Sequence, residues 1–69
     1  MKVLSEITGT VWKVEVQPGQ SVAEGDTLLI VESMKMEIPV CATAAGTVRE
    51  IFVAEGEGVE DGQVVVELG

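Results

Sequence analysis

The feature that most restricts this sequence is an internal repeat at a constant separation of 37 residues. Residues 9–31, GTVWKVEVQPGQSVAEGDTLLIV, align without a gap with residues 46–68, GTVREIFVAEGEGVEDGQVVVEL. The identical pairs are Gly9/Gly46, Thr10/Thr47, Val11/Val48, Val16/Val53, Gly19/Gly56, Val22/Val59 and Gly25/Gly62. Two similar halves are therefore expected, each burying its apolar face against the other.

The repeated segments have the pattern of short β-strands separated by tight turns. Trp12, Val14 and Val16 alternate with Lys13 and Glu15, which is the period-two pattern of a strand. Glycines stand where chains turn, as in Pro-Gly, Glu-Gly-Asp and Asp-Gly. No window favours a helix. The sequence predicts an all-β sandwich or flattened barrel with quasi two-fold internal symmetry, formed by residues 1–69 as one domain.

Comparing the two copies helps to assign positions to the interior or the rim. Trp12 aligns with Arg49, and a position that accepts both an indole and a guanidinium is expected at the rim. Ile30 aligns with Glu67, so the neighbouring positions are the better candidates for the interior. These candidates are Leu29/Val66 and Val31/Leu68.

The junction between the copies contains the sequence ESMKMEI, residues 32–38. Residues 31–33 and 36–40 are predicted to be strand segments, which makes Met34 and Lys35 the tip of a hairpin. Pro39 follows in a position that must lie on an edge strand or donate no ladder hydrogen bond. With two-fold symmetry, the point equivalent to the hairpin is the C-terminus. It is expected at the opposite end, beside the N-terminal strand.

Composition excludes several classes of function. The chain has 69 residues, 46% of them hydrophobic, with one cysteine, no histidine, no tyrosine and a net charge of −8. A nucleic-acid or anionic-membrane partner is not expected for such an acidic chain. No apolar run is long enough for a membrane span, and the first residues lack a signal-peptide core. A lone thiol and no export signal favour the cytoplasm. Without histidine, catalysis by the chain's own side chains is not expected.

A plain structural interpretation of the junction stands beside a functional one. A lysine in a turn is usually only solvated, and Met34 and Met36 could fill gaps in the core. Glu32 and Glu37 would then be solvated charges at strand ends. Trp12, Cys41 and Phe52 are most simply interpreted as packing residues. The functional interpretation depends on the position of Lys35. This lysine lies at the junction of the repeat, at a predicted pole of the molecule, between two apolar neighbours.

The residues Met34-Lys35-Met36, within this particular repeat, resemble the attachment motif of biotinyl domains, the biotin carboxyl carrier family. The similarity covers nearly the whole chain. It implies a flattened barrel of two four-stranded antiparallel sheets with Lys35 on an exposed hairpin, flanked by Glu32, Ser33 and Glu37. Ser33 stands where the family often has alanine, a small change. The ungapped repeat leaves no room for the "thumb" of some carriers, so the chain resembles the thumbless, short stand-alone type.

The resemblance also implies a function. Lys35 would be acylated with biotin by a biotin protein ligase that recognises Met34 and Met36. The domain would then carry carboxybiotin between a biotin carboxylase and a carboxyltransferase, without being an enzyme itself. Three alternatives remain at this point: a lipoate carrier using the same lysine, an unmodified structural module of the kind found in transport adaptors, and an enzyme in its own right. Lipoyl domains commonly have Asp before the lysine and Ala after it, unlike Met34 and Met36.

Overall fold

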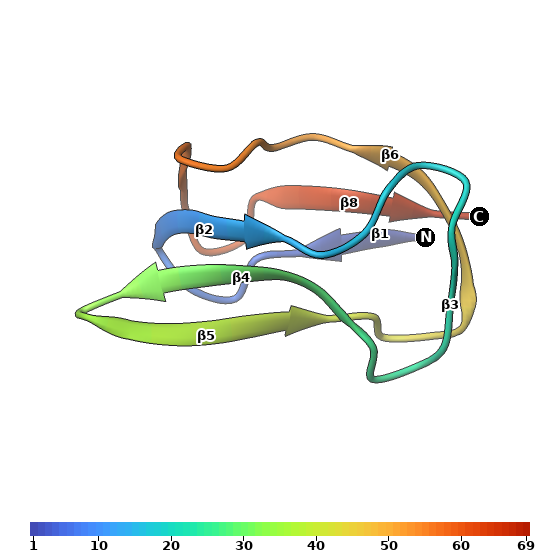
Figure 1. The fold of residues 1–69 in the computed structure, drawn as a ribbon, viewed down its shortest axis with the longest axis horizontal. Coiled ribbons are helices and arrows are strands. Elements are labelled where there is room, and N and C mark those ends of the chain that lie inside the picture. Colours follow the sequence, from blue (N-terminus) through green and yellow to red (C-terminus); the bar gives the residue numbers. More distant parts are fainter.

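A computed structural model describes residues 1–69, and it is all-β (Figure 1). Eight strands form two four-stranded antiparallel sheets, and the molecule measures 30 × 19 × 18 Å. The predicted fold class is confirmed. The strands are β1 (Lys2–Leu4), β2 (Gly9–Val14), β3 (Ser21–Val22), β4 (Thr27–Ser33), β5 (Met36–Cys41), β6 (Gly46–Ile51), β7 (Gly58–Val59) and β8 (Val64–Leu68).

The two copies of the repeat are interlocked by the exchange of one short strand each. One sheet has the order β1-β8-β6-β3 and the other has the order β5-β4-β2-β7. The strand β3 belongs to the first copy but pairs with β6 of the second, and β7 pairs with β2 in the reciprocal way. Neither copy can complete a sheet without the other, so the two halves must fold together.

The symmetry extends beyond the residues that are visibly repeated, because β1 is the structural counterpart of β5. In one sheet Leu29 lies opposite Val40, and 37 residues away Val66 lies opposite Val3. Under the 37-residue relation, residues 1–32 correspond to residues 38–69, and residues 33–37 have no counterpart among residues 1–69. The hairpin that carries Lys35 is thus the part of the fold without a counterpart.

Fifteen buried apolar residues form a single core between the sheets. The four interior residues expected from the repeat, Leu29, Val31, Val66 and Leu68, are all buried. The strict alternation predicted for β2 is wrong. The register of β2 against β4 shifts between Val11 and Lys13, and the same shift occurs in β6 between Val48 and Glu50. These bulges turn Val11 and Val48 inward.

The same bulges leave the intervening position outside. Trp12 is 49% exposed and Arg49 is also exposed, so the predicted rim position is confirmed. The interpretation of Trp12 as a packing residue is wrong, and so is that of Phe52, which is 45% exposed. Cys41 is partly buried, as a packing residue should be.

A glycine lets the hairpin strand pass close to its neighbour. A Cβ atom at Gly9 would collide with the backbone carbonyl oxygen of Glu32 and come within 2.8 Å of the Val31 Cγ1 atom. At the equivalent Gly46, a Cβ atom would lie 2.9 Å from the carbonyl oxygen of Gly69. The absence of a side chain at these two glycines therefore allows Glu32 and Gly69 to pack closely against β2 and β6.

The two strands β1 and β5 are edge strands, one in each sheet, and each carries a residue that discourages further pairing. Pro39 of β5 has no amide hydrogen to donate, and its position on an edge strand confirms the sequence prediction. Its counterpart in β1 is Lys2, an exposed lysine. Both residue types are known to protect sheet edges against the addition of another strand.

Candidate functional site: an isolated lysine at one pole

The site is a two-residue turn at the far end of the molecule. The ladder between β4 and β5 continues to the pair Ser33 and Met36, which leaves only Met34 and Lys35 in the turn. Both have positive φ, 52° and 65°. Two successive left-handed residues identify the turn class that matches the twist of hairpin strands. The predicted hairpin tip is confirmed, and Figure 1 shows it at the opposite end from the two termini.

The turn is conformationally unfavourable for its residues. Turns of this class favour Asn-Gly, because other side chains are strained at positive φ by about 1–2 kcal/mol per residue. Met34 and Lys35 are the only residues other than glycine with positive φ in this chain. Strain of this kind is concentrated at functional sites in proteins. The residue types at the tip are therefore not explained by the stability of the turn.

The amine of Lys35 is held out into solvent. Lys35 is exposed, and its Nζ atom makes no hydrogen bond or ion pair with the protein. The ion pair that does form in this chain joins Lys13 and Glu15 at 3.5 Å, on β2 and the segment after it. No side chain covers the Lys35 amine or competes for it, so it is accessible to another macromolecule.

The two methionines are on the surface. Met34 is 92% exposed and Met36 is 63% exposed, so the alternative that they fill gaps in the core is wrong. Exposed methionines on both sides of the lysine create a flexible apolar surface, of the sort that adapts to a binding partner. Their burial in a complex would supply binding energy that the free domain leaves unused.

Acidic residues lie directly behind the tip. Glu32 and Glu37 face each other across the ladder, and both are exposed. Like charges directly opposite each other on antiparallel strands destabilise the pair slightly. Ser33, between Glu32 and the turn, is partly buried and pairs with Met36. All six residues of the predicted site are thus brought together on the hairpin, in the order expected from the sequence.

The chemistry available at this pole is that of an acceptor for an acyl group. A primary amine without a neighbouring base can be acylated when the acyl donor is already activated elsewhere. Nowhere in the chain do three or more metal-binding side chains gather. No helix is long and apolar enough to cross a membrane.

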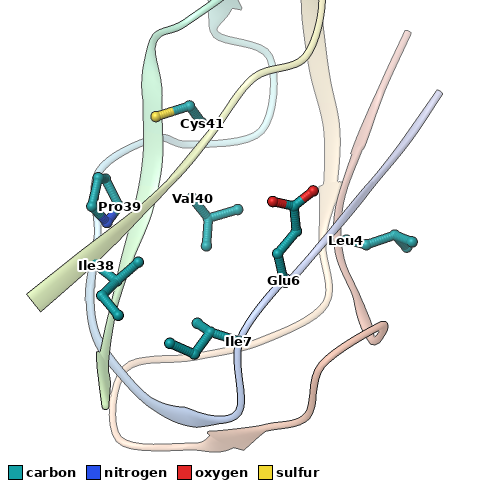
Figure 2. Close-up of a pocket in the computed structure, with 7 residues that line it drawn as sticks. All are labelled: Leu4, Glu6, Ile7, Ile38, Pro39, Val40 and Cys41. Carbon is teal, nitrogen blue, oxygen red and sulfur yellow. The ribbon is translucent and has the colours of Figure 1, made fainter. Parts of the chain in front are cut away.

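One feature near the site was not predicted from the sequence. A groove of about 360 Å³ lies between the edge strand β5 and the segment Leu4–Ile7, at the end of the edge strand β1 (Figure 2). Its lining residues are Leu4, Glu6, Ile7, Ile38, Pro39, Val40 and Cys41. Residues 1–8 share only one identity with the structurally equivalent residues 38–45, namely Val3 with Val40. The sequence therefore gave no sign that these segments lie together.

Comparison with known proteins places these features in a wider group. Residues 2–68 match the biotin/lipoyl family model, described as "Biotin-requiring enzyme". The biotin/lipoyl attachment protein of Bacillus subtilis (strain 168) is 43% identical over 68 residues, which cover 99% of this chain and 93% of that protein. The pyruvate carboxylase of the same organism is 38% identical over 66 residues, 96% of this chain but only 6% of that protein.

Solved structures agree with the sequence comparison. The urea carboxylase of Kluyveromyces lactis superimposes with a TM-score of 0.95 at 38% identity, covering 100% of this chain and 6% of that chain. A single-chain, multi-domain long-chain acyl-CoA carboxylase superimposes with a TM-score of 0.89 at 26% identity, covering 96% of this chain and 7% of that one. The match to these large proteins is therefore confined to a small part of each.

Proposed function

This chain belongs to the biotin/lipoyl attachment family, and we propose that biotin is attached to the Nζ atom of Lys35. Family membership makes biotin the cofactor and makes the chain a carrier domain of a biotin-dependent carboxylase, with a non-catalytic role. The observation that carries the assignment of the residue is the isolation of the Lys35 amine at the tip of the unrepeated hairpin.

The attachment reaction requires the partner enzyme to supply activation. The Nζ atom of Lys35 makes no hydrogen bond or ion pair with a group of this chain that could take up its proton. A biotin protein ligase would present the biotinyl carboxyl group already activated and would accept the proton. The amide bond forms between Nζ and the carboxyl carbon while the bond to the activating group breaks. What this chain contributes is rigid presentation of the amine between Met34 and Met36.

Attachment changes the electrostatics of the pole. Lys35 is the only basic residue of the hairpin, and conversion of its amine to an amide would leave Glu32 and Glu37 unopposed. The modified pole would be distinguishable from the unmodified one by charge alone. If a ligase recognises the ammonium group of the unmodified domain, it would bind the biotinylated domain less tightly and release it more readily.

The bound biotin supplies the carboxyl-accepting chemistry, and the protein supplies position. A rigid barrel with the attachment point at its end allows the arm to reach two active sites without dissociation of the cofactor. Tethering replaces a free encounter with an effective concentration around millimolar. The partners proposed for this chain are therefore a biotin protein ligase, a biotin carboxylase and a carboxyltransferase.

The test is intact-mass measurement and peptide mapping after incubation with a biotin protein ligase, ATP and biotin. The wild type should gain one biotinyl group on Lys35, and Lys35→Arg should gain none. The variants Lys2→Arg and Lys13→Arg are matched controls and should be modified like the wild type. Modification that persists in Lys35→Arg would refute the assignment. An adduct formed with lipoate and lipoate ligase, but not with biotin, would assign the same lysine to a lipoyl carrier instead.

A further inference from the structure

The groove between β1 and β5 is lined by residues 38–41 of β5 and by residues of the segment 4–7, at the end of β1. Figure 2 shows Ile38 and Val40 on one side of it and Ile7 and Glu6 on the other, with the Glu6 carboxylate pointing past Val40, away from the two isoleucines. At the other end the segments just outside these two edge strands are bridged, because the Thr43 hydroxyl donates a hydrogen bond of 3.3 Å to the sulfur of Met1. No hydrogen bond bridges residues 4–7 and 38–41.

This asymmetry separates two places that the fold would otherwise make equivalent. Under the 37-residue relation, Ile7 and Ile38 correspond to Ala44 and Met1. Ile7 and Ile38 therefore border the groove at the hairpin end. At the other end the equivalent positions hold a small residue, Ala44, and Met1, which covers the space. The lining of the groove therefore begins at Ile38, on the strand that leaves the attachment hairpin.

We propose that this groove is an intramolecular seat for the biotinyl group of Lys35, a role that depends on the proposed attachment. The strand β5 connects the two places directly, since it begins one residue after Lys35 and lines the groove from Ile38 onward. Three residues of extended strand separate Lys35 from Ile38, or about 10 Å. The lysine side chain with the acyl chain of biotin contains about eleven bonds, which reach roughly 13 Å at the advance per bond of an extended chain.

The lining matches the chemistry of that group. Five of the seven lining residues are hydrophobic, which suits the hydrocarbon chain and the sulfur-containing ring of biotin. The Glu6 carboxylate is a hydrogen-bond acceptor for the N–H groups of the ureido ring. A volume of about 360 Å³ lies at the lower end of the range for small-ligand sites. Tethering gives the biotinyl group an effective concentration near millimolar at the groove. Even a weak affinity for the groove would therefore keep the group bound there for part of the time.

Another strand is a poor occupant of the same space. Pro39 lacks the amide hydrogen that a pairing strand would need, and Lys2 places a charge on the opposite edge. A compact ligand with an apolar body and one polar edge makes no demand on those backbone groups. The groove therefore favours the chain's own arm over a second copy of the protein.

The experiment is a titration of the unmodified chain with biotin N-methylamide, which copies the amide formed at the lysine, followed by methyl-selective NMR. We expect the methyl signals of Ile7 and Ile38 to shift progressively up to about 5 mM probe, the range set by the effective concentration of a tether. The signals of Val22, which is buried away from the groove, should not move. Biotinylation of Lys35 should shift the Ile7 and Ile38 signals in the same direction without added probe, and acetylation of Lys35 should not.

Two variants separate a seat from an indirect effect. Ile38→Asn should weaken the response of Ile7 to the probe at least fivefold, whereas Ile51→Asn, a matched partly buried isoleucine outside the groove, should leave it unchanged. Unmoved Ile7 and Ile38 signals at the highest probe concentration would overturn the proposal. So would a doubling of the mass of the chain in solution that Ile38→Asn abolishes, because a second copy would then occupy the groove.

The titration does not involve a ligase, so the two proposals can fail separately. Probe binding in the groove with no adduct on Lys35 would refute the carrier assignment and leave a biotin-binding groove. An adduct on Lys35 with unmoved groove signals would refute only the seat.

Discussion

The two ends of this barrel are built from equivalent backbone and differ in how the chain closes them. At one end β4 and β5 are joined by Met34 and Lys35. At the other end, β8 and β1 occupy the equivalent positions but are not joined. The N-terminal ammonium group of Met1 donates to the carbonyl oxygen of Leu68 at 2.6 Å, and the amide of Leu68 donates to the carbonyl oxygen of Met1 at 2.7 Å.

The comparison separates what the fold needs from what the site needs. Two antiparallel strands hold together at the terminal end by hydrogen bonds alone, so a covalent turn is not required to complete the sheet there. The five residues that close the hairpin end are therefore available for a task other than folding. They contain a strained turn, two exposed methionines and Glu37, which lies opposite the like charge of Glu32, and all of these features reduce stability or solubility.

The largest expected effect on stability comes from substituting Gly9 and Gly46, the paired glycines that allow close backbone contact at the two ends. Gly9→Ala should lower the free energy of unfolding by about 3 kcal/mol, because the new methyl group meets the Glu32 backbone, which the hairpin keeps in place. Gly46→Ala should cost about 1 kcal/mol, since its Cβ atom would lie 2.9 Å from the carbonyl oxygen of Gly69, a less severe contact than the one at Gly9. Urea denaturation measures both. Equal costs would show that the terminal end is as rigid as the hairpin end.

A smaller effect is expected from replacing the tip with the residues that the turn favours. The double substitution Met34→Asn with Lys35→Gly should raise the free energy of unfolding by about 1–2 kcal/mol, because both positive-φ positions would be relaxed. It should also abolish modification. Thermal and urea unfolding measure the gain, with Met34→Ala as a control that retains the strain. A loss of stability would mean that Met34 or Lys35 makes a stabilising contact in solution.

The smallest effect concerns the acidic pair behind the tip. Glu37→Gln should raise the free energy of unfolding by about 0.5 kcal/mol by removing a like charge opposite Glu32. The gain should shrink in about 1 M salt, where exposed charges are screened. Glu50 and Glu67 form a second opposed pair in the other sheet, and Glu67 also lies opposite Lys2, so Glu50→Gln is the matched comparison away from the site. A gain that does not depend on salt would point to packing or hydrogen bonding in place of repulsion.

The fold class and the position of the hairpin that carries Lys35 were predictable from sequence because both depend on local and repeated signals. Turn glycines, β-branched residues and the 37-residue repeat indicate the strands, and the break in that repeat locates Lys35. The bulges at Val11 and Val48 were not predictable from alternation, since a bulge depends on pairing with a partner strand. The groove was not predictable either. It depends on β1 and β5, whose structural equivalence leaves almost no trace in their side chains.

The closeness of Met1 to Leu68 has a mechanical consequence for any larger assembly. Linkers fused to either terminus would both emerge from the same side of the barrel, with Lys35 at the far end of its 30 Å length. The domain would then rotate as a rigid body about its linkers, and its full length would add to the distance that the attached biotinyl arm can reach.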